Sequence, residues 1–189
     1  ISGAPSTVNN TTPFTINVDF SEPVTGFTAG GVTVGNGTSS NLAGSGSNYT
    51  VDITPTGAGD ISLDVGAGVA QDAASNNNTA ASQVVVTYDA TAPTVVISGA
   101  PSTVNSTTPF TINVDFSESV TGFTAGGVTV GNGTSSNLAG SGSNYTVDIT
   151  PTGAGDITLD VNASVAQDAA SNNNTAASQV VVTYDASAP

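Results

Sequence analysis

The sequence predicts an all-β chain built from two consecutive β-sandwich domains. Three observations lead to this prediction: the composition, a repeat with a period of 96 residues, and an alternation of apolar and polar residues within each repeat. Val, Thr, Ile, Ser, Asn and Gly are abundant, and these residues favour strands and turns over helices. With 37% hydrophobic and only 7% charged residues, the chain should fold rather than stay disordered.

The repeat sets the domain organisation. Residues 1–93 align with residues 97–189, and six of the 93 aligned positions differ. A unit of this length is too long for a solenoid or propeller repeat and matches one small sandwich domain. We therefore predict domains at 1–90 and 91–189, the first lacking the beginning of its first strand and the second including the start of the next linker.

Alternating residues mark the strands of one repeat. Phe14, Ile16, Val18 and Phe20 face one way and the residues between them the other, which is typical of a half-buried strand. Gly- and Asn-rich turns separate the strands. The remaining candidates lie at 24–27, 32–34, around 42, at 49–53, 61–65 and 84–88, and an opening strand is seen whole at 94–97 in the second repeat.

About seven strands per repeat indicate an immunoglobulin-like β-sandwich. Successive strands of such a sandwich run in opposite directions, so an odd number takes the chain from one end of the domain to the other. Domains of this kind are expected to line up end to end, each extending roughly 40 Å along the array when a strand residue rises about 3.3 Å.

The charges exclude several functions. The chain has 14 Asp and Glu residues and no Lys, Arg or His, which gives a formal charge of −14. Nucleic-acid binding by phosphate neutralisation is therefore not expected. Neither is a catalytic triad or a His or Cys zinc site, because the chain also lacks Cys. Asp19 and Glu22 could supply a glycosidase's residue types, but a duplicated active site is a poor explanation for such similar repeats. We predict no enzymatic activity and no small-molecule substrate.

The sequence also gives a prediction about membrane insertion. The longest apolar run is three valines, so no membrane insertion is expected.

The strand directions bring four acids towards the end where the linker arrives: Asp89, Asp115, Glu118 and Asp168. No basic side chain is available to neutralise them. Carboxylate oxygens with turn carbonyls and water suit Ca²⁺, and suit Mg²⁺ less well because its octahedron is stricter. We predict a calcium site at the joint, to which Asp60 of the preceding domain could also contribute.

Several segments in a fixed order resemble a known family. They are Phe20 to Phe27, Gly31 to Thr38, Gly44 to Val51, the run Asp72-Ala73-Ala74-Ser75-Asn76 and the linker Asp89-Ala90-Thr91-Ala92-Pro93. Together they resemble the bacterial immunoglobulin-like (Big) repeats of large secreted adhesins, including the repeats-in-toxin type. Ser75 and Ser171 stand where the family's Asp-Ala-Ala-Gly-Asn segment has glycine, and Ser119 replaces the proline of the first repeat.

The resemblance implies a structural extender on the bacterial cell surface. Such repeats would hold a distal adhesive module away from the cell, with neighbouring repeats of the same chain as their partners. It also implies calcium at the joints, carried over to Asp89, Glu118 and Asp168. The alternative is a carbohydrate-binding surface module. Such modules use exposed aromatic residues, whereas this chain has no Trp, and Tyr49 and Tyr145 are expected to be buried with bonded hydroxyls.

Overall fold

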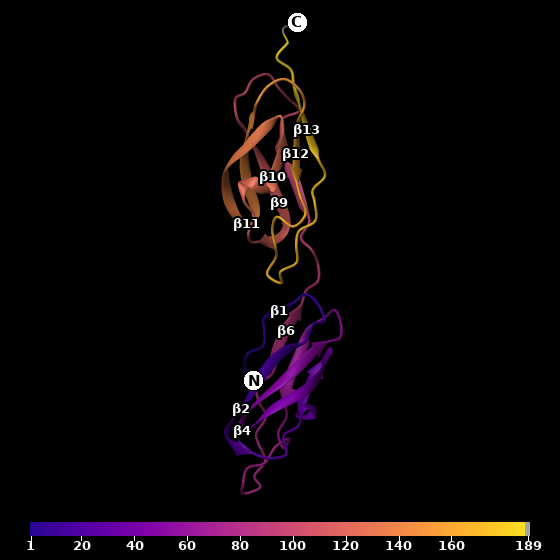
Figure 1. The fold of residues 1–189 in the computed structure, drawn as a ribbon, viewed down its shortest axis with the longest axis vertical. Helices are drawn as coiled ribbons and strands as arrows, with labels where there is room; N and C mark the ends of the chain where they lie inside the picture. Colours follow the sequence, from indigo (N-terminus) through magenta and orange to yellow (C-terminus); the bar gives the residue numbers. More distant parts are fainter. Residues whose placement is uncertain (188–189) are drawn as a thin grey trace. The chain divides into compact units, whose positions relative to one another are not determined.

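The computed structural model describes residues 1–187. It contains two compact units, Ile1–Ala90 and Thr91–Pro189. Their regular secondary structure consists of strands and one short 3₁₀ turn in each unit (Figure 1). Among the described residues, no helix has the length and apolar character needed to span a bilayer.

The second unit has seven strands in two sheets. One sheet has the order β10-β12-β13-β8 and the other the order β11-β9-β7. All pairs are antiparallel except β8 with β13, which are parallel. The elements are β7 (Val95–Ser98), β8 (Thr103–Val104), β9 (Phe110–Val120), η2 (Ala125–Gly127), β10 (Val128–Gly131), β11 (Gly133–Pro151), β12 (Ile157–Val161) and β13 (Val180–Tyr184).

The first unit repeats this arrangement with six strands. Its sheets have the orders β1-β6-β5-β3 and β2-β4. The counterpart of β7 is reduced to an isolated bridge between Ser2 and Asn17, which is why the unit falls one short of the predicted seven. The elements are β1 (Thr7–Val8), β2 (Phe14–Val24), η1 (Ala29–Gly31), β3 (Val32–Gly35), β4 (Gly37–Pro55), β5 (Ile61–Val65) and β6 (Val84–Tyr88).

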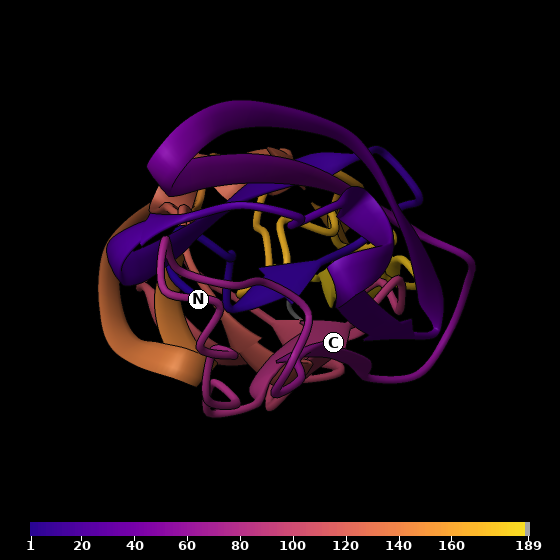
Figure 2. The ribbon, with the colours of Figure 1, turned by 90° about the horizontal axis from the view of Figure 1, so that it is seen from below.

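Two predicted strands are absorbed into longer ones. The candidate at 24–27 is wrong as a separate strand, because Val24 ends β2 after an irregularity that begins past Asp19. The candidate around Leu42 is likewise part of β4, whose long ribbon is strongly curved in Figure 2. Positive φ angles at Asn41 and Gly44 allow this curvature, and a Cβ at Gly44 would collide with the Asn48 carbonyl oxygen.

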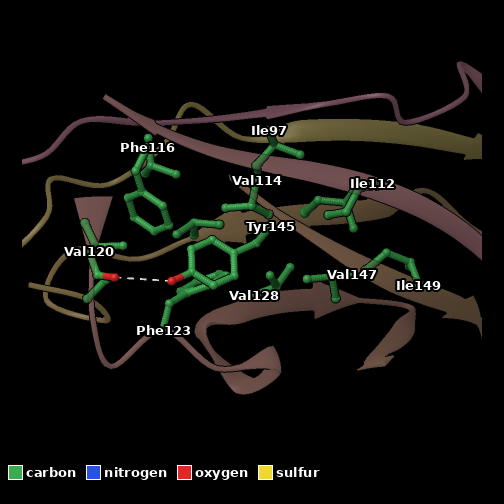
Figure 3. Close-up of a cluster of buried hydrophobic side chains, with 14 of the residues drawn as sticks. Ile97, Ile112, Val114, Phe116, Val120, Phe123, Val128, Tyr145, Val147 and Ile149 are labelled. Carbon is green, nitrogen blue, oxygen red and sulfur yellow. Dashed lines mark hydrogen bonds between the residues drawn. The ribbon is translucent and has the colours of Figure 1, made fainter. Parts of the chain in front are cut away.

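The alternating strand residues form the core of each unit. In the second unit Ile112 and Val114 of β9 are completely buried, and facing residues from both sheets join them. Three aromatic rings, Phe116, Phe123 and Tyr145, meet edge to face with centroids 5.1 to 6.0 Å apart. The Tyr145 hydroxyl donates a hydrogen bond of 3.3 Å to the Val120 carbonyl oxygen (Figure 3). The predicted burial of Tyr145 and of Tyr49 is confirmed, since each is 8% exposed.

Parallel pairing fixes where the chain enters and leaves a domain. The strand that follows β7, β8, runs in the same direction as the last strand, β13. In the first unit β1 and β6 are paired in the same way. The opening and closing strands of a unit therefore point the same way. In the second unit, residues 91–94 lie at one end and the segment after Tyr184 leaves at the other (Figure 1).

Replacing Tyr145 with Phe should lower the free energy of unfolding of the second unit by about 0.5–1.5 kcal/mol. The ring would keep its packing, but the buried Val120 carbonyl would lose a hydrogen-bond donor. Urea denaturation followed by circular dichroism measures the change. Tyr184→Phe, at a partly exposed position, is the control, and an equal loss in both variants would contradict the assigned role of the Tyr145 hydroxyl.

Candidate metal centre

Glu118 lies in the irregular part of β9. The pairing of β9 with β11 is regular up to Asp115 opposite Asn144, shifts, and resumes at Val120 opposite Gly142. Residues 116–119 therefore have no partner on β11. Such an irregularity redirects side chains near the end of a strand. Glu118 is partly buried there. On the other side of this segment, the Ser117 amide donates to the Thr94 carbonyl oxygen at 2.9 Å, which ties β9 to the incoming chain.

Asp168 lies in the loop between β12 and β13 and is held by that loop. Its Oδ1 accepts hydrogen bonds of 2.8 Å from the amides of Ala170 and Asn172, and its Oδ2 accepts one of 2.9 Å from Asn172 Nδ2. Such bonds from an Asp to the amides that follow it define a tight local turn. The side chain is only 5% exposed, so its carboxylate is both oriented and largely removed from water.

Asp89 follows β6 directly, and its amide donates a hydrogen bond of 2.9 Å to the Val8 carbonyl oxygen. One carboxylate oxygen each from Asp89, Glu118 and Asp168 lies within 4.8 Å of the other two. Asp168 is buried and the other two are partly buried. The structure thus brings together three of the five acids that the sequence singled out.

The donor set fits a hard divalent cation. Two oxygens bound to one Ca²⁺ at about 2.3 to 2.6 Å each can be at most roughly 5.2 Å apart, so the 4.8 Å limit of this cluster is compatible with shared coordination. Three carboxylates would supply part of a six- to eight-oxygen shell, with carbonyls or water completing it. Three negative groups in a partly dry site also favour a cation of high charge.

The other two predicted ligands lie elsewhere. Asp115 is in the regular part of β9, opposite Val96, and its Oδ2 accepts a 3.4 Å hydrogen bond from Ser98 Oγ. It is not in the three-acid cluster, and it is paired on both sides, with Val96 of β7 and with Asn144 of β11. Asp60 is not in the cluster either, and its backbone carbonyl accepts a hydrogen bond from Asn36 Nδ2.

Sequence reasoning missed Asn174, which holds the loop that carries Asp168. Its side chain is 2% exposed and accepts 2.9 Å hydrogen bonds from the amides of Val165 and Ala166. Its amide group donates to the Asn162 and Thr175 carbonyl oxygens at 2.9 and 2.7 Å. Asn174 is the last of three consecutive Asn residues, and the sequence did not indicate which of the three would be buried. Ser171, in the same loop, keeps the left-handed conformation of the family glycine, with φ of 69°.

The first repeat carries the same loop around Asp72. Asp72 accepts hydrogen bonds of 2.8 Å from the Ala74 and Asn76 amides and from Asn76 Nδ2. Glu22 corresponds to Glu118 but is exposed, and Asp72 is less buried than Asp168.

These features define a class of protein: an acidic, tandem immunoglobulin-like β-sandwich with a carboxylate cluster at the start of the second repeat. The chain belongs to the bacterial Ig-like domain family, whose model matches residues 1–88 and 89–184. The second match begins at Asp89, so all three clustered acids fall within one family repeat.

Comparison with solved structures found the crystal structure of invasin, described as a bacterial integrin-binding protein. The likeness has a TM-score of 0.41 and 13% sequence identity, and covers 97% of this chain and 39% of the invasin chain. This chain thus spans well under half the length of that protein. No curated protein matches the sequence.

The stability of the first unit should fall in acid partly because of Asp72. The side chain of Asn76, and then the amides of Asn76 and Ala74, lower the pKa of Asp72 below its usual 3.8. A carboxyl whose pKa is lower in the folded protein stabilises it above the unfolded value, and this contribution disappears as the pH falls through the folded pKa. Thermal unfolding from about pH 5 to pH 2 should show less acid destabilisation for Asp72→Asn than for the wild type. Equal pH dependence in the two proteins would contradict this role.

Proposed function

We propose that this chain is a structural extender of a bacterial surface adhesin and that calcium stiffens its repeats. The supporting observation is the parallel pairing of an early strand with the last strand of each unit, β1 with β6 and β8 with β13, which carries the chain through a domain from one end to the other. Length is then gained simply by adding repeats. The family assignment supports a bacterial Ig-like module that serves structure or binding rather than catalysis, and a location outside the cell.

Calcium has a specific task in this proposal. Asp89 is anchored by its backbone to β1, while its carboxylate lies near those of Glu118 and Asp168. A cation shared by the three acids would fix Asp89 to the irregular end of β9 and to the loop that carries Asp168. Without a cation, the repulsion among the carboxylates works against this arrangement. Extracellular calcium would therefore convert a compliant joint into a stiff one.

The alternative, a carbohydrate-binding module, has little support from the aromatic residues. Sugar-binding platforms need exposed rings, and the rings of Tyr49 and Tyr145 are buried against Phe27 and Phe123. Their hydroxyls are bonded to backbone carbonyls at 3.2 and 3.3 Å. The exposed large hydrophobic side chains are valines: Val85, Val96 and Val181.

Calorimetric titration of the whole chain with CaCl₂ should show one calcium site whose affinity drops at least about tenfold in Glu118→Gln or Asp89→Asn. The matched controls are Glu22→Gln and Asp72→Asn, the equivalent positions in the first repeat, which should leave the affinity unchanged. The proposal of a calcium site would be wrong if no heat of binding appears at millimolar calcium. It would also be wrong if the control variants weaken binding as much as the site variants.

Small-angle scattering tests the mechanical part separately. In calcium the maximum dimension should be longer than in EDTA, and the distribution of interatomic distances should be better defined. The reason is that a bound ion would restrict bending between repeats. Glu118→Gln in calcium should behave like the wild type in EDTA. If calcium binds in the titration yet leaves the scattering curve unchanged, the ion has a local structural role and stiffening is ruled out.

A further inference from the structure

The chain turns from β3 into β4 at a single residue, Asn36, and Gly37 follows as the first residue of β4. Asn36 has a φ of 54°, in the left-handed region that Asn tolerates better than most residues. A Cβ at Gly37 would lie 2.8 Å from Val34 Cγ1 and 3.0 Å from the Thr54 carbonyl oxygen, so the position favours glycine. The turn therefore favours the pair Asn-Gly, and Asn132-Gly133 takes its place in the second repeat.

Asn36 also ties this turn to the connection between β4 and β5. Its Nδ2 donates a hydrogen bond of 2.9 Å to the Asp60 carbonyl oxygen, and its own carbonyl oxygen accepts one of 3.0 Å from the Thr56 amide. Gly59 leaves room for the first of these bonds, since a Cβ there would lie 2.8 Å from Asn36 Nδ2. Asn36 is exposed, so water reaches the residue while its side chain and its carbonyl are held.

The second repeat reproduces both contacts. Asn132, with a φ of 53°, donates a hydrogen bond of 2.9 Å to the Asp156 carbonyl oxygen and accepts one of 3.0 Å from the Thr152 amide. The chain also supplies an internal comparison, because the exposed residue Asn41 has a similar φ of 49° and a hydrogen-bonded side chain. Asn41 is followed by Leu42 rather than by glycine.

An Asn that precedes Gly can lose its side-chain amide without an enzyme. The Gly37 nitrogen attacks Cγ of Asn36, a bond forms between them, and the Cγ–Nδ2 bond breaks, so that ammonia leaves with the proton of the Gly37 amide. Water then adds to one of the two carbonyls of the cyclic imide and opens it, which yields either Asp or isoaspartate. Glycine favours the reaction because it has no side chain to hinder the approach of its nitrogen. Water is the only co-reactant.

The folded repeat opposes this ring closure. The Asn36 side chain and the backbone beside it have to rotate before Cγ meets the Gly37 nitrogen in the required direction, and the bonds to Asp60 and Thr56 restrict both rotations. Local opening of the turn would release them. We propose that Asn36 and Asn132 are sites of spontaneous deamidation that the folded repeat holds back and that react once the repeat opens.

Either product would weaken the turn. A carboxylate has no proton to donate to the Asp60 carbonyl oxygen, and it places a negative charge beside that oxygen. Isoaspartate also carries Cβ in the main chain, which lengthens the single-residue connection between β3 and β4. A repeat that opens and reacts thus refolds with lower stability, and the modification remains as a permanent record of the opening. Calcium has no part in this chemistry.

The first experiment compares deamidation in the folded and in the unfolded chain. The whole chain is kept in mildly alkaline buffer, with or without concentrated urea, and is then cut by an endoprotease that cleaves before Asp. The peptides 19–51 and 115–147 carry Pro23 and Ser119 respectively, so their masses distinguish the repeats, and fragmentation places the modified residue. Asn36 and Asn132 should react at least about tenfold faster in urea than in native buffer. Equal rates in the two conditions would overturn the proposal, as would a rate in urea no higher than that of Asn41.

A second experiment tests the hydrogen bond to Asp60. Gly59→Ala places a Cβ against Asn36 Nδ2, so the rate in native buffer should rise severalfold at Asn36 while Asn132 reacts as in the wild type. Gly155→Ala is the matched variant and should give the opposite pattern. If either substitution unfolds its unit, which circular dichroism would reveal, the rate at that site should equal the rate in urea. An unchanged rate at Asn36 in Gly59→Ala would refute the protective role of the hydrogen bond.

A third experiment measures the effect of the product on stability. Asn36→Asp combined with Asn132→Asp should lower the thermal unfolding midpoint of the whole chain by about 3 to 8 °C, because each unit loses a hydrogen-bond donor. The control, Asn10→Asp with Ser106→Asp, adds the same charge at exposed, equivalent positions and keeps an acceptor for the amide two residues ahead. An equal shift in the two proteins would show that charge alone is responsible and would overturn the role assigned to Asn36 Nδ2.

Discussion

The parallel pairing of an early strand with the last strand is the constraint on which the rest of each domain depends. Once β8 lies parallel to β13, the chain has to enter at one end and leave at the other. The irregular end of β9 and the loop that begins after β12 then lie beside the incoming segment, as the hydrogen bonds from Ser117 and Thr175 to residues 93 and 94 show. The three clustered acids come from these three places. Their proximity is therefore a consequence of topology rather than of any local motif.

Burial makes this proximity costly. Two charges about 5 Å apart in a protein environment with an effective dielectric constant near 20 repel by roughly 3 kcal/mol, and Asp168 is largely removed from water as well. Three hydrogen bonds from its own loop offset part of the cost of desolvation. No Lys, Arg or His exists in the sequence to offset the rest. A composition without basic side chains thus leaves this cluster with no side chain of opposite charge, and neutralising it is the role that we propose for calcium.

The sequence could predict the features that follow from the alternation of apolar and polar residues and from the direction of each strand. The alternation in Ile112 and Val114 predicted the buried face, and the burial of Tyr145 followed from the need for apolar residues. Asp115 and Glu118 were predicted to lie together because both follow the second strand at the end of the domain where the linker arrives. Their separation depends on the register of β9 against both β7 and β11, which single-sequence patterns do not encode. Asn174 escaped notice for a similar reason, since its hydrogen bonds join backbone groups from separate parts of the long connection between β12 and β13.

The near-identical repeats allow the burial of equivalent residues to be compared within one molecule. With 87 of 93 aligned residues identical, a difference in burial between equivalent positions must come from neighbouring chain rather than from the residues themselves. Phe20 and Phe116 differ in this way, and so do Asn78 and Asn174, and both pairs adjoin the place where residues 93–95 lie in the second repeat. The core strands, by contrast, are equally buried in both units. Residues 93–95 thus form part of the surroundings of Phe116 and of the loop that carries Asn174 in the second repeat.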